Sequence, residues 1–104
     1  MGFRVDYSPK ARMDFLGTLE YISDDLSSPK AAERFNENLT KKEIFISENP
    51  FMYPLSRDEK LRAAGYRCAV VGNYSMLYLV DEEKSKVTIA RIIYGARDLT
   101  AIDI

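Results

Sequence analysis

The sequence contains no histidine and only one cysteine, Cys68. Ser-His-Asp and Cys-His catalytic arrangements need an imidazole base, so this composition excludes both. A structural zinc site usually takes four Cys or His ligands, and an intrachain disulfide takes two cysteines, so neither can form. Acid–base chemistry would have to use Asp, Glu, Lys or Tyr. We expect no metal and no cofactor.

Long hydrophobic runs and an excess of basic charge are also missing. No stretch of about 20 apolar residues could cross a membrane, and residues 1–10 lack the apolar segment of a signal peptide. The sequence therefore predicts a cytoplasmic protein without a membrane partner. The net charge is −1, whereas proteins that grip nucleic-acid phosphates are usually clearly basic, so only a local basic patch could serve that purpose. The 104 residues suit one domain, spanning 1–104, because domains centre on roughly 100–150 residues.

Two Ser-Pro pairs divide the first half of the chain. Apolar and polar residues alternate over 3–7, which predicts a short strand. Ser8-Pro9 and Ser28-Pro29 then each provide a helix N-cap followed by proline at the first helical position. Apolar residues recur every three to four positions after each pair, which predicts helices over about 9–25 and from 29 to Asn49-Pro50.

The second half alternates in the manner of strands. Residues 66–71, 74–80 and 87–94 form three strand patterns, separated by Gly72-Asn73 and by a polar turn over 81–86. Residues 60–64 could form a loop or an edge strand. The order predicts an α+β fold, in which an N-terminal strand and an antiparallel helical hairpin pack on a mainly antiparallel sheet ending in a three-stranded meander. The pairing position of the first strand stays open.

Three residues of the predicted strands stand out. Arg91 is in phase with apolar neighbours, so we expect it to meet a buried carboxylate or to reach the sheet edge. Cys68 is in phase with Tyr66 and Val70, which suggests a small core residue. Arg67 alternates with these residues and is therefore predicted to point away from the helices, towards a functional face.

The segment 89–99 reads IARIIYGARDL: an arginine-containing apolar strand, Tyr94-Gly95, then Arg97-Asp98-Leu99. It resembles the C-terminal signature of ParE-type toxins. The central strands and the helical hairpin are similar to the same family, the RelE/ParE toxins of type II toxin–antitoxin systems, and closer to the ParE-like (plasmid stabilisation) branch. That similarity rests on Gly65-Tyr66-Arg67, Gly72-Asn73-Tyr74, Tyr78, Ala11, Asp14-Phe15, Tyr21-Ile22 and Ala31-Ala32. The resemblance implies a cytoplasmic bacterial toxin that inhibits growth and is neutralised by a cognate antitoxin.

The two branches of this family differ in target. The RelE-like branch cleaves messenger RNA on the ribosome with lysines and arginines on its sheet, whereas the ParE-like branch poisons DNA gyrase and has no established catalytic set. Ser75 stands where the nuclease branch commonly has arginine, and Asp103 stands near its C-terminal tyrosine position. DNA gyrase is therefore the predicted target. The alternatives are a ribosome-dependent mRNA endonuclease and a non-toxic relative that acts as an interaction module.

The resemblance also nominates site residues. If the chain is a nuclease, the catalytic candidates are Lys60, Arg67 and Arg97. A second register would align Lys60-Leu61-Arg62 and Gly65-Tyr66-Arg67 with the nuclease's strand. The predicted target-binding residues are Arg67, Tyr94, Arg97 and Asp98.

Phe51, Met52 and Tyr53 form an apolar cluster within an irregular segment. Exposed apolar patches often mark partner sites. These three residues are therefore predicted to receive an amphipathic or extended segment of the antitoxin, in a hetero-oligomer.

Overall fold

The computed structural model describes residues 2–25, 27–95 and 104. Its elements, in chain order, are β1 (Arg4–Tyr7), α1 (Pro9–Glu20), the π-helical turn η1 (Tyr21–Asp25), α2 (Pro29–Glu48), α3 (Glu59–Ala63), β2 (Arg67–Val71), β3 (Tyr74–Asp81) and β4 (Lys86–Tyr94).

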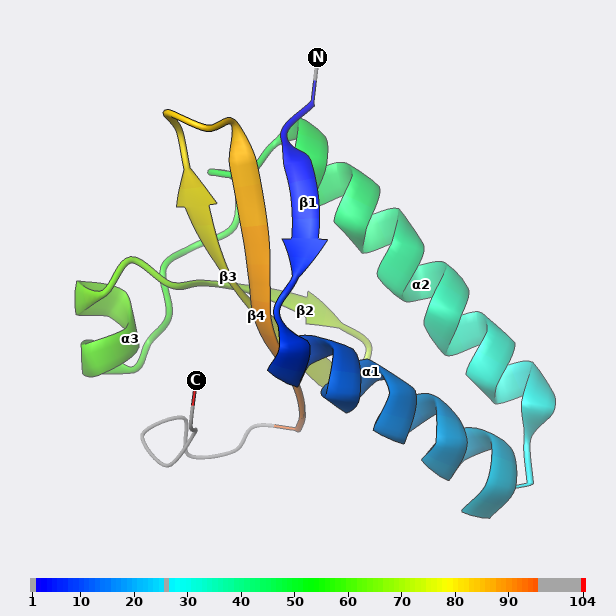
Figure 1. Cartoon of the computed structure of the whole chain (residues 1–104). Coiled ribbons are helices and arrows are strands. Elements are labelled where there is room, and N and C mark those ends of the chain that lie inside the picture. The colour runs from blue at the N-terminus through cyan, green and yellow to red at the C-terminus, as the bar shows by residue number, and fades with distance from the viewer. Residues whose placement is uncertain (1, 26, 96–103) are drawn as a thin grey trace.

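The strands form one sheet in the order β1-β4-β3-β2, in which β1 runs parallel to β4 and the other pairs are antiparallel. The helices α1 and α2 lie on one side of this sheet and the short α3 lies on the other (Figure 1). The predicted α+β architecture, including the final meander, is confirmed.

Both Ser-Pro pairs begin helices as predicted. The Ser8 hydroxyl accepts a hydrogen bond from the Ala11 N–H at 3.0 Å, and Ser28 caps α2 in the same way. The first predicted helix, 9–25, covers α1 together with η1, so its last turn is wound more loosely than an α-helix. No helix of the described residues is long and apolar enough to cross a membrane.

The first strand takes the edge beside β4, with Val5 opposite Val87. Its outer side is tied to the end of α2, because the Phe3 N–H donates to the Ser47 carbonyl at 2.8 Å and the Ser47 hydroxyl donates to the Phe3 carbonyl. The Tyr7 hydroxyl donates to Glu43 Oε1 at 2.7 Å, and burial beside this carboxylate raises the pKa of Tyr7. These long-range contacts decide the position that the sequence pattern left open.

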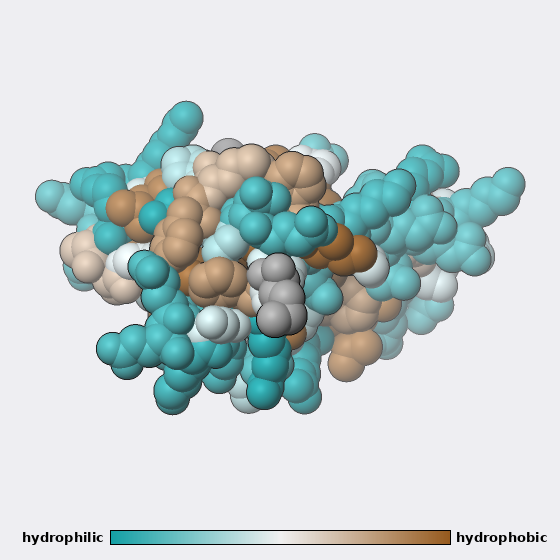
Figure 2. All heavy atoms as spheres, turned by 90° about the horizontal axis from the view of Figure 1, so that it is seen from above, coloured by the Kyte–Doolittle hydropathy of each residue, from teal (hydrophilic) through white to brown (hydrophobic). Residues whose placement is uncertain are grey.

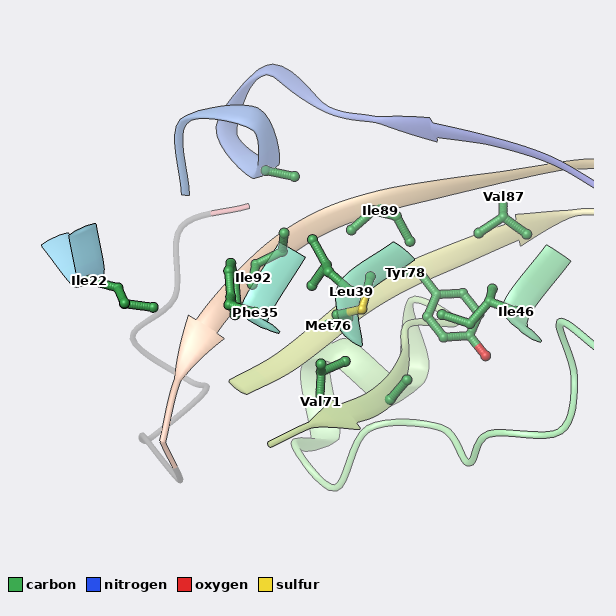
Figure 3. Packing of buried hydrophobic residues seen from close by; sticks show 12 residues of the cluster. Ile22, Phe35, Leu39, Ile46, Val71, Met76, Tyr78, Val87, Ile89 and Ile92 are labelled. Carbon is green, nitrogen blue, oxygen red and sulfur yellow. The ribbon is translucent and has the colours of Figure 1, made fainter. Parts of the chain in front are cut away.

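The hydrophobic core lies between the sheet and the two long helices (Figure 3). Tyr78 is fully buried there, and its hydroxyl donates to the Pro50 carbonyl at 2.8 Å. Burial raises the pKa of Tyr78 to about 12. The other large core side chains come from α2, β2, β3 and β4 and include Phe35, Leu39, Ile46, Val71, Met76, Val87, Ile89 and Ile92.

The predicted orientation of β2 is wrong. Ala69 and Val71 enter the core, whereas Val70 is 60% exposed. Arg67 shares the helix-facing side with Ala69 and Val71, and Cys68 lies on the opposite face, where it is half-buried. Both alternating sets in this strand contain small or apolar residues, so the pattern does not select a face. Residues 59–63 form α3 rather than a loop or strand, because the Asp58 carboxylate accepts the Leu61 N–H at 2.9 Å and caps a helical turn.

Arg91 lies at a β-bulge in β4, where it pairs with Asp14 of α1. The ladder pairs Leu77 with Arg91 and Tyr78 with Ile89, which leaves Ala90 unpaired. Asp14 of α1 accepts Arg91 Nε at 2.7 Å, Arg91 Nη2 at 3.0 Å and the Ile92 N–H at 2.9 Å.

The carboxylate predicted for Arg91 is therefore confirmed as Asp14. The prediction that Arg91 lies on the same face as Val87 and Ile89 is wrong. The bulge adds one residue, so that Ile92, and not residue 91, is the next side chain to enter the core. The Ser8 hydroxyl donates to the Ala90 carbonyl at 2.8 Å, so the backbone that the bulge releases from the ladder bonds to the first turns of α1.

We expect Asp14→Ala to lower the free energy of unfolding by about 2–3 kcal/mol, because it removes the carboxylate that accepts two bonds from the half-buried Arg91 guanidinium and one from the Ile92 N–H. Urea denaturation measures this loss. Glu33→Ala, an exposed acid on α2, is the matched control and should change stability by less than about 0.5 kcal/mol. In the double variant with Arg91→Met the loss should be smaller than the sum of the two single losses. Additive losses would contradict the coupling.

Tyr78→Phe should cost about 1–2 kcal/mol through loss of the hydrogen bond to Pro50. It should also change how the free energy of unfolding depends on pH in the alkaline range. A folded pKa of about 12 against an ordinary value of 10 means that the contribution of Tyr78 is fully present below pH 10 and is lost as the pH rises through 12. Between pH 10 and pH 12 the free energy of unfolding should therefore decrease less steeply with pH for Tyr78→Phe than for the parent. An unchanged slope, equal to that of the control Tyr66→Phe, would count against this assignment.

Candidate functional site

Sheet side chains fix the backbone that follows α2. Beside the Tyr78 bond to Pro50, Arg67 Nη1 donates to the Tyr53 carbonyl at 2.7 Å and to the Phe51 carbonyl at 3.3 Å. The Arg67 guanidinium also lies over the Phe51 ring, 5.1 Å from its centroid. Although the segment has no regular secondary structure of its own, three of its carbonyls are held from below, so it presents its side chains in a defined arrangement.

These side chains form an apolar surface at one end of the molecule, which we call the aromatic end surface. Phe51 is 47% exposed, Met52 54% and Phe45 47%, and Tyr53 is half-buried. Ring contacts connect its aromatic members: Phe51 packs edge-on against Phe3 with centroids 6.3 Å apart, and Phe45 lies 6.4 Å from Tyr53. Figure 2 looks onto this end and shows hydrophobic residues gathered among hydrophilic ones.

The structure thus brings together the three residues predicted to bind an antitoxin and adds two that the sequence analysis missed. Phe45 precedes Ile46 and so lies outside the buried apolar stripe of α2. A large apolar residue outside that stripe is a signal in the sequence that could have indicated an exposed apolar side chain. Phe3 was assigned only to a strand. Lys42 borders the surface, with its Nζ 3.1 Å from the Tyr53 hydroxyl and 5.0 Å from the ring centroid. An apolar surface with a lysine at its edge suits an apolar partner segment that places an acidic residue opposite Lys42.

A groove lies beside α1, at the C-terminal end of β4. Its volume is about 800 Å³. Tyr94, a predicted target-binding residue, is 56% exposed there and packs edge-on against Tyr74 with centroids 5.2 Å apart. Burial is the main cause that raises the pKa of Tyr74, and Tyr94 adds to it. Other residues that line the groove are Met13, Gly17, Tyr21, Asn73 and Arg91.

The remaining predicted site residues do not converge in the part of the chain that the structure describes. Arg67 pairs with Tyr78, whereas Tyr94 pairs with Tyr74, four residues away on β3. At about 3.3 Å per residue this separates their rows by roughly 13 Å. Lys60 is exposed on α3, and Arg97 and Asp98 lie outside the described residues.

The helical conformation of α3 contradicts the part of the second register that placed Lys60-Leu61-Arg62 on a strand, whereas Arg67, the last residue of that register, does begin β2. Within residues 2–25, 27–95 and 104, no group of three His, Cys, Asp or Glu side chains could hold a metal ion. The described geometry therefore offers two binding surfaces: one apolar and one groove with an exposed tyrosine.

Comparisons with known proteins agree with this fold. A chain of the chromosomal ParDE system of P. aeruginosa superposes with a TM-score of 0.71 at 15% identity, covering 90% of this chain and 97% of that one. A chain of the RelBE2 toxin–antitoxin complex of Mycobacterium tuberculosis gives 0.65 at 23% identity, covering 90% and 99%. The isolated E. coli RelE toxin gives 0.58 at 17% identity, covering 94% and 89%.

No curated protein sequence matches the chain. The sequence does match, over residues 5–99, the family described as the ParE toxin of the type II toxin–antitoxin system parDE. Because this match spans nearly the whole chain and the fold agrees with it, the chain belongs to the ParE toxin family and is the toxin of a type II toxin–antitoxin system.

Proposed function

We propose that this toxin stops growth by acting on DNA gyrase, and that a cognate antitoxin neutralises it by covering the aromatic end surface. The observation that carries the choice of target is the position of Arg67. Its guanidinium bonds to two backbone carbonyls and lies on the Phe51 ring, which supports a structural role. A cation that is engaged in this way is poorly placed to stabilise the charge that develops on a phosphate during RNA cleavage.

Two further residues support the same choice. Lys60 is exposed on α3, which lies on the far side of the sheet from the helical hairpin, whereas Arg67 belongs to the helix-facing side of β2. Ser75 occupies β3 where the nuclease branch commonly has arginine. RNA cleavage by 2′-hydroxyl attack needs a base, an acid and cations around one phosphate. The RelE-like alternative keeps one favourable observation, the basic side chains of Lys60 and Arg62 on one short helix.

The antitoxin proposal rests on the structural relatives and on the aromatic end surface. The matched chains of ParDE and RelBE come from toxin–antitoxin systems. Here Arg67 and Tyr78 already bond to the carbonyls of Pro50, Phe51 and Tyr53 within the single chain, and Phe51 and Met52 are exposed. A preformed apolar surface loses little conformational freedom on binding, which favours affinity. Aromatic side chains at the centre of an interface also carry much of its binding energy.

The target is tested with two assays on the purified toxin: supercoiling by gyrase, and cleavage of messenger RNA on programmed ribosomes. We expect inhibited supercoiling, an intact message, and relief of inhibition by Tyr94→Ala and by Arg97→Ala. Lys60→Ala is the matched control and should leave the inhibition unchanged. Codon-phased cleavage that Lys60→Ala abolishes, with normal supercoiling, would overturn the gyrase proposal in favour of the nuclease. Harmless expression of folded protein would favour the interaction module.

For the antitoxin, the candidate is the product of the neighbouring open reading frame. Phe51→Ala and Met52→Ala should each raise its dissociation constant by about 10-fold to 100-fold, as expected for residues at the centre of an interface. Calorimetric titration measures the change. Val70→Ala, which truncates a 60% exposed apolar side chain on β2, is the control and should have little effect. Equal effects at all three positions would remove the aromatic end surface as the binding site.

A further inference from the structure

The two edge strands of the sheet are closed to different extents. Beside β2, residues 54–56 form a bridge that exchanges backbone hydrogen bonds with residues 66–68. Beside β1, the bonds that the structure describes on the outer side are those between Phe3 and Ser47, at the very start of the strand. An unpaired strand edge is a template for another strand, and proteins usually cover it. The rest of the β1 edge is therefore a candidate docking site.

The alternation along β1 decides which backbone groups lie on its open edge. The N–H groups of Arg4 and Ser8 both donate towards β4, to carbonyls 2.9 Å away. Since successive residues of a strand face opposite sides, the N–H and C=O groups of Val5 and Tyr7 point to the outer edge. None of the residues that the structure describes bonds to these four groups. Four such groups in register match the backbone of one extended peptide.

The open edge leads into a notch of about 360 Å³ between the two long helices. In Figure 1, α1 begins at one end of β1 and α2 ends at the other, and the helices come together towards the far tip of their hairpin. Tyr7, Arg12, Phe15, Leu16 and Glu43 line the notch. The Tyr7 side chain faces the helices. Because directly opposite residues of neighbouring strands share a face, a residue paired with Tyr7 would enter the notch.

The charges on the other face of β1 favour an acidic partner. Asp6 Oδ2 lies 2.9 Å from Arg4 Nη2 and 3.8 Å from Lys86 Nζ, so that two cations share one carboxylate. The hydrogen bond from Arg4 lowers the pKa of Asp6, and the charge of Lys86 adds to this effect. One of the two cations can therefore pair with a carboxylate from a neighbouring strand, as charge complementarity across an interface requires.

From the open edge, the notch and the unbalanced charge we propose that an extended segment of the antitoxin adds to the sheet beside β1. It bonds to the backbone of Val5 and Tyr7 and places an apolar side chain in the notch. Phe3, which packs on Phe51, joins this edge to the aromatic end surface, so this inference rests on the proposed antitoxin site and extends it. A second copy of β1 does not fit, because antiparallel pairing about Val5 would bring its Tyr7 opposite Phe3, where Ser47 already lies.

Hydrogen exchange measured by NMR tests the strand pairing, on the purified toxin alone and bound to the product of the neighbouring open reading frame. In the free toxin the amides of Val5 and Tyr7 should exchange faster than those of Arg4 and Ser8, which already have acceptors. In the complex, exchange at Val5 and Tyr7 should slow by at least about 10-fold, and by more than at Arg4 and Ser8. A complex in which Val5 and Tyr7 exchange as fast as in the free toxin overturns the proposal.

Leu16→Lys tests the notch, because Leu16 is 62% exposed and its replacement spares the core but puts a charge where the apolar side chain should bind. It should raise the dissociation constant of the antitoxin by about 10-fold. Ile44→Lys makes the same change at a 54% exposed position of α2 and is the matched control, with no effect expected. If Leu16→Lys behaves like Ile44→Lys while Phe51→Ala weakens binding, the notch is excluded and the aromatic end surface stands. If none of the three weakens binding, both proposals fail.

Discussion

The contact between Asp14 and the bulge of β4 sets the position of α1 and, through it, the shape of the groove beside that helix. A bulge frees backbone groups that the ladder would otherwise pair. Here the Asp14 carboxylate accepts the Ile92 N–H and both Arg91 donors, and Ser8 donates to the Ala90 carbonyl. Buried polar groups without partners are costly, so this site strongly favours one docking of α1 on β4. The outer face of α1 and the groove that it borders with Tyr94 follow from that docking.

A comparable arrangement holds the other end of the molecule. Pro50, Phe51 and Tyr53 have no strand or helix to satisfy their carbonyls, and Tyr78 and Arg67 do so from the sheet. Both donors belong to the helix-facing side of β2 and β3, directly opposite one another in the ladder. The polar groups of the sheet thus order the segment from beneath, and its apolar side chains are left to face outwards. The same hydrogen bonds from Arg67 and Tyr78 thus satisfy the carbonyls of the segment and leave its aromatic side chains exposed.

How far the sequence predicts this structure depends on the distance over which each signal acts. The helix starts at Ser8 and Ser28 are local and were predicted correctly, and so were the strands that form the meander. Arg91 was expected to meet a carboxylate, but the choice of Asp14 depends on a bulge that breaks the alternation. The face of β2 was predicted wrongly, because Cys68 and Val70 are as apolar as Ala69 and Val71 and only the packing of α2 distinguishes them. The place of β1 depends on Ser47 and Glu43, which lie some 40 residues away in the sequence, and no local pattern encodes it.

Arg67 and Gly17 illustrate opposite errors that residue type alone invites. An arginine on a strand is readily interpreted as a functional group, yet the carbonyls of Phe51 and Tyr53 and the Phe51 ring account for this one within its own chain. A glycine in a helix attracts little notice, yet within residues 2–25, 27–95 and 104 nothing lies within 4 Å of a Cβ built at Gly17. Since an unfavourable residue lowers stability unless something offsets its cost, a residue without an internal explanation is the better pointer to an external contact.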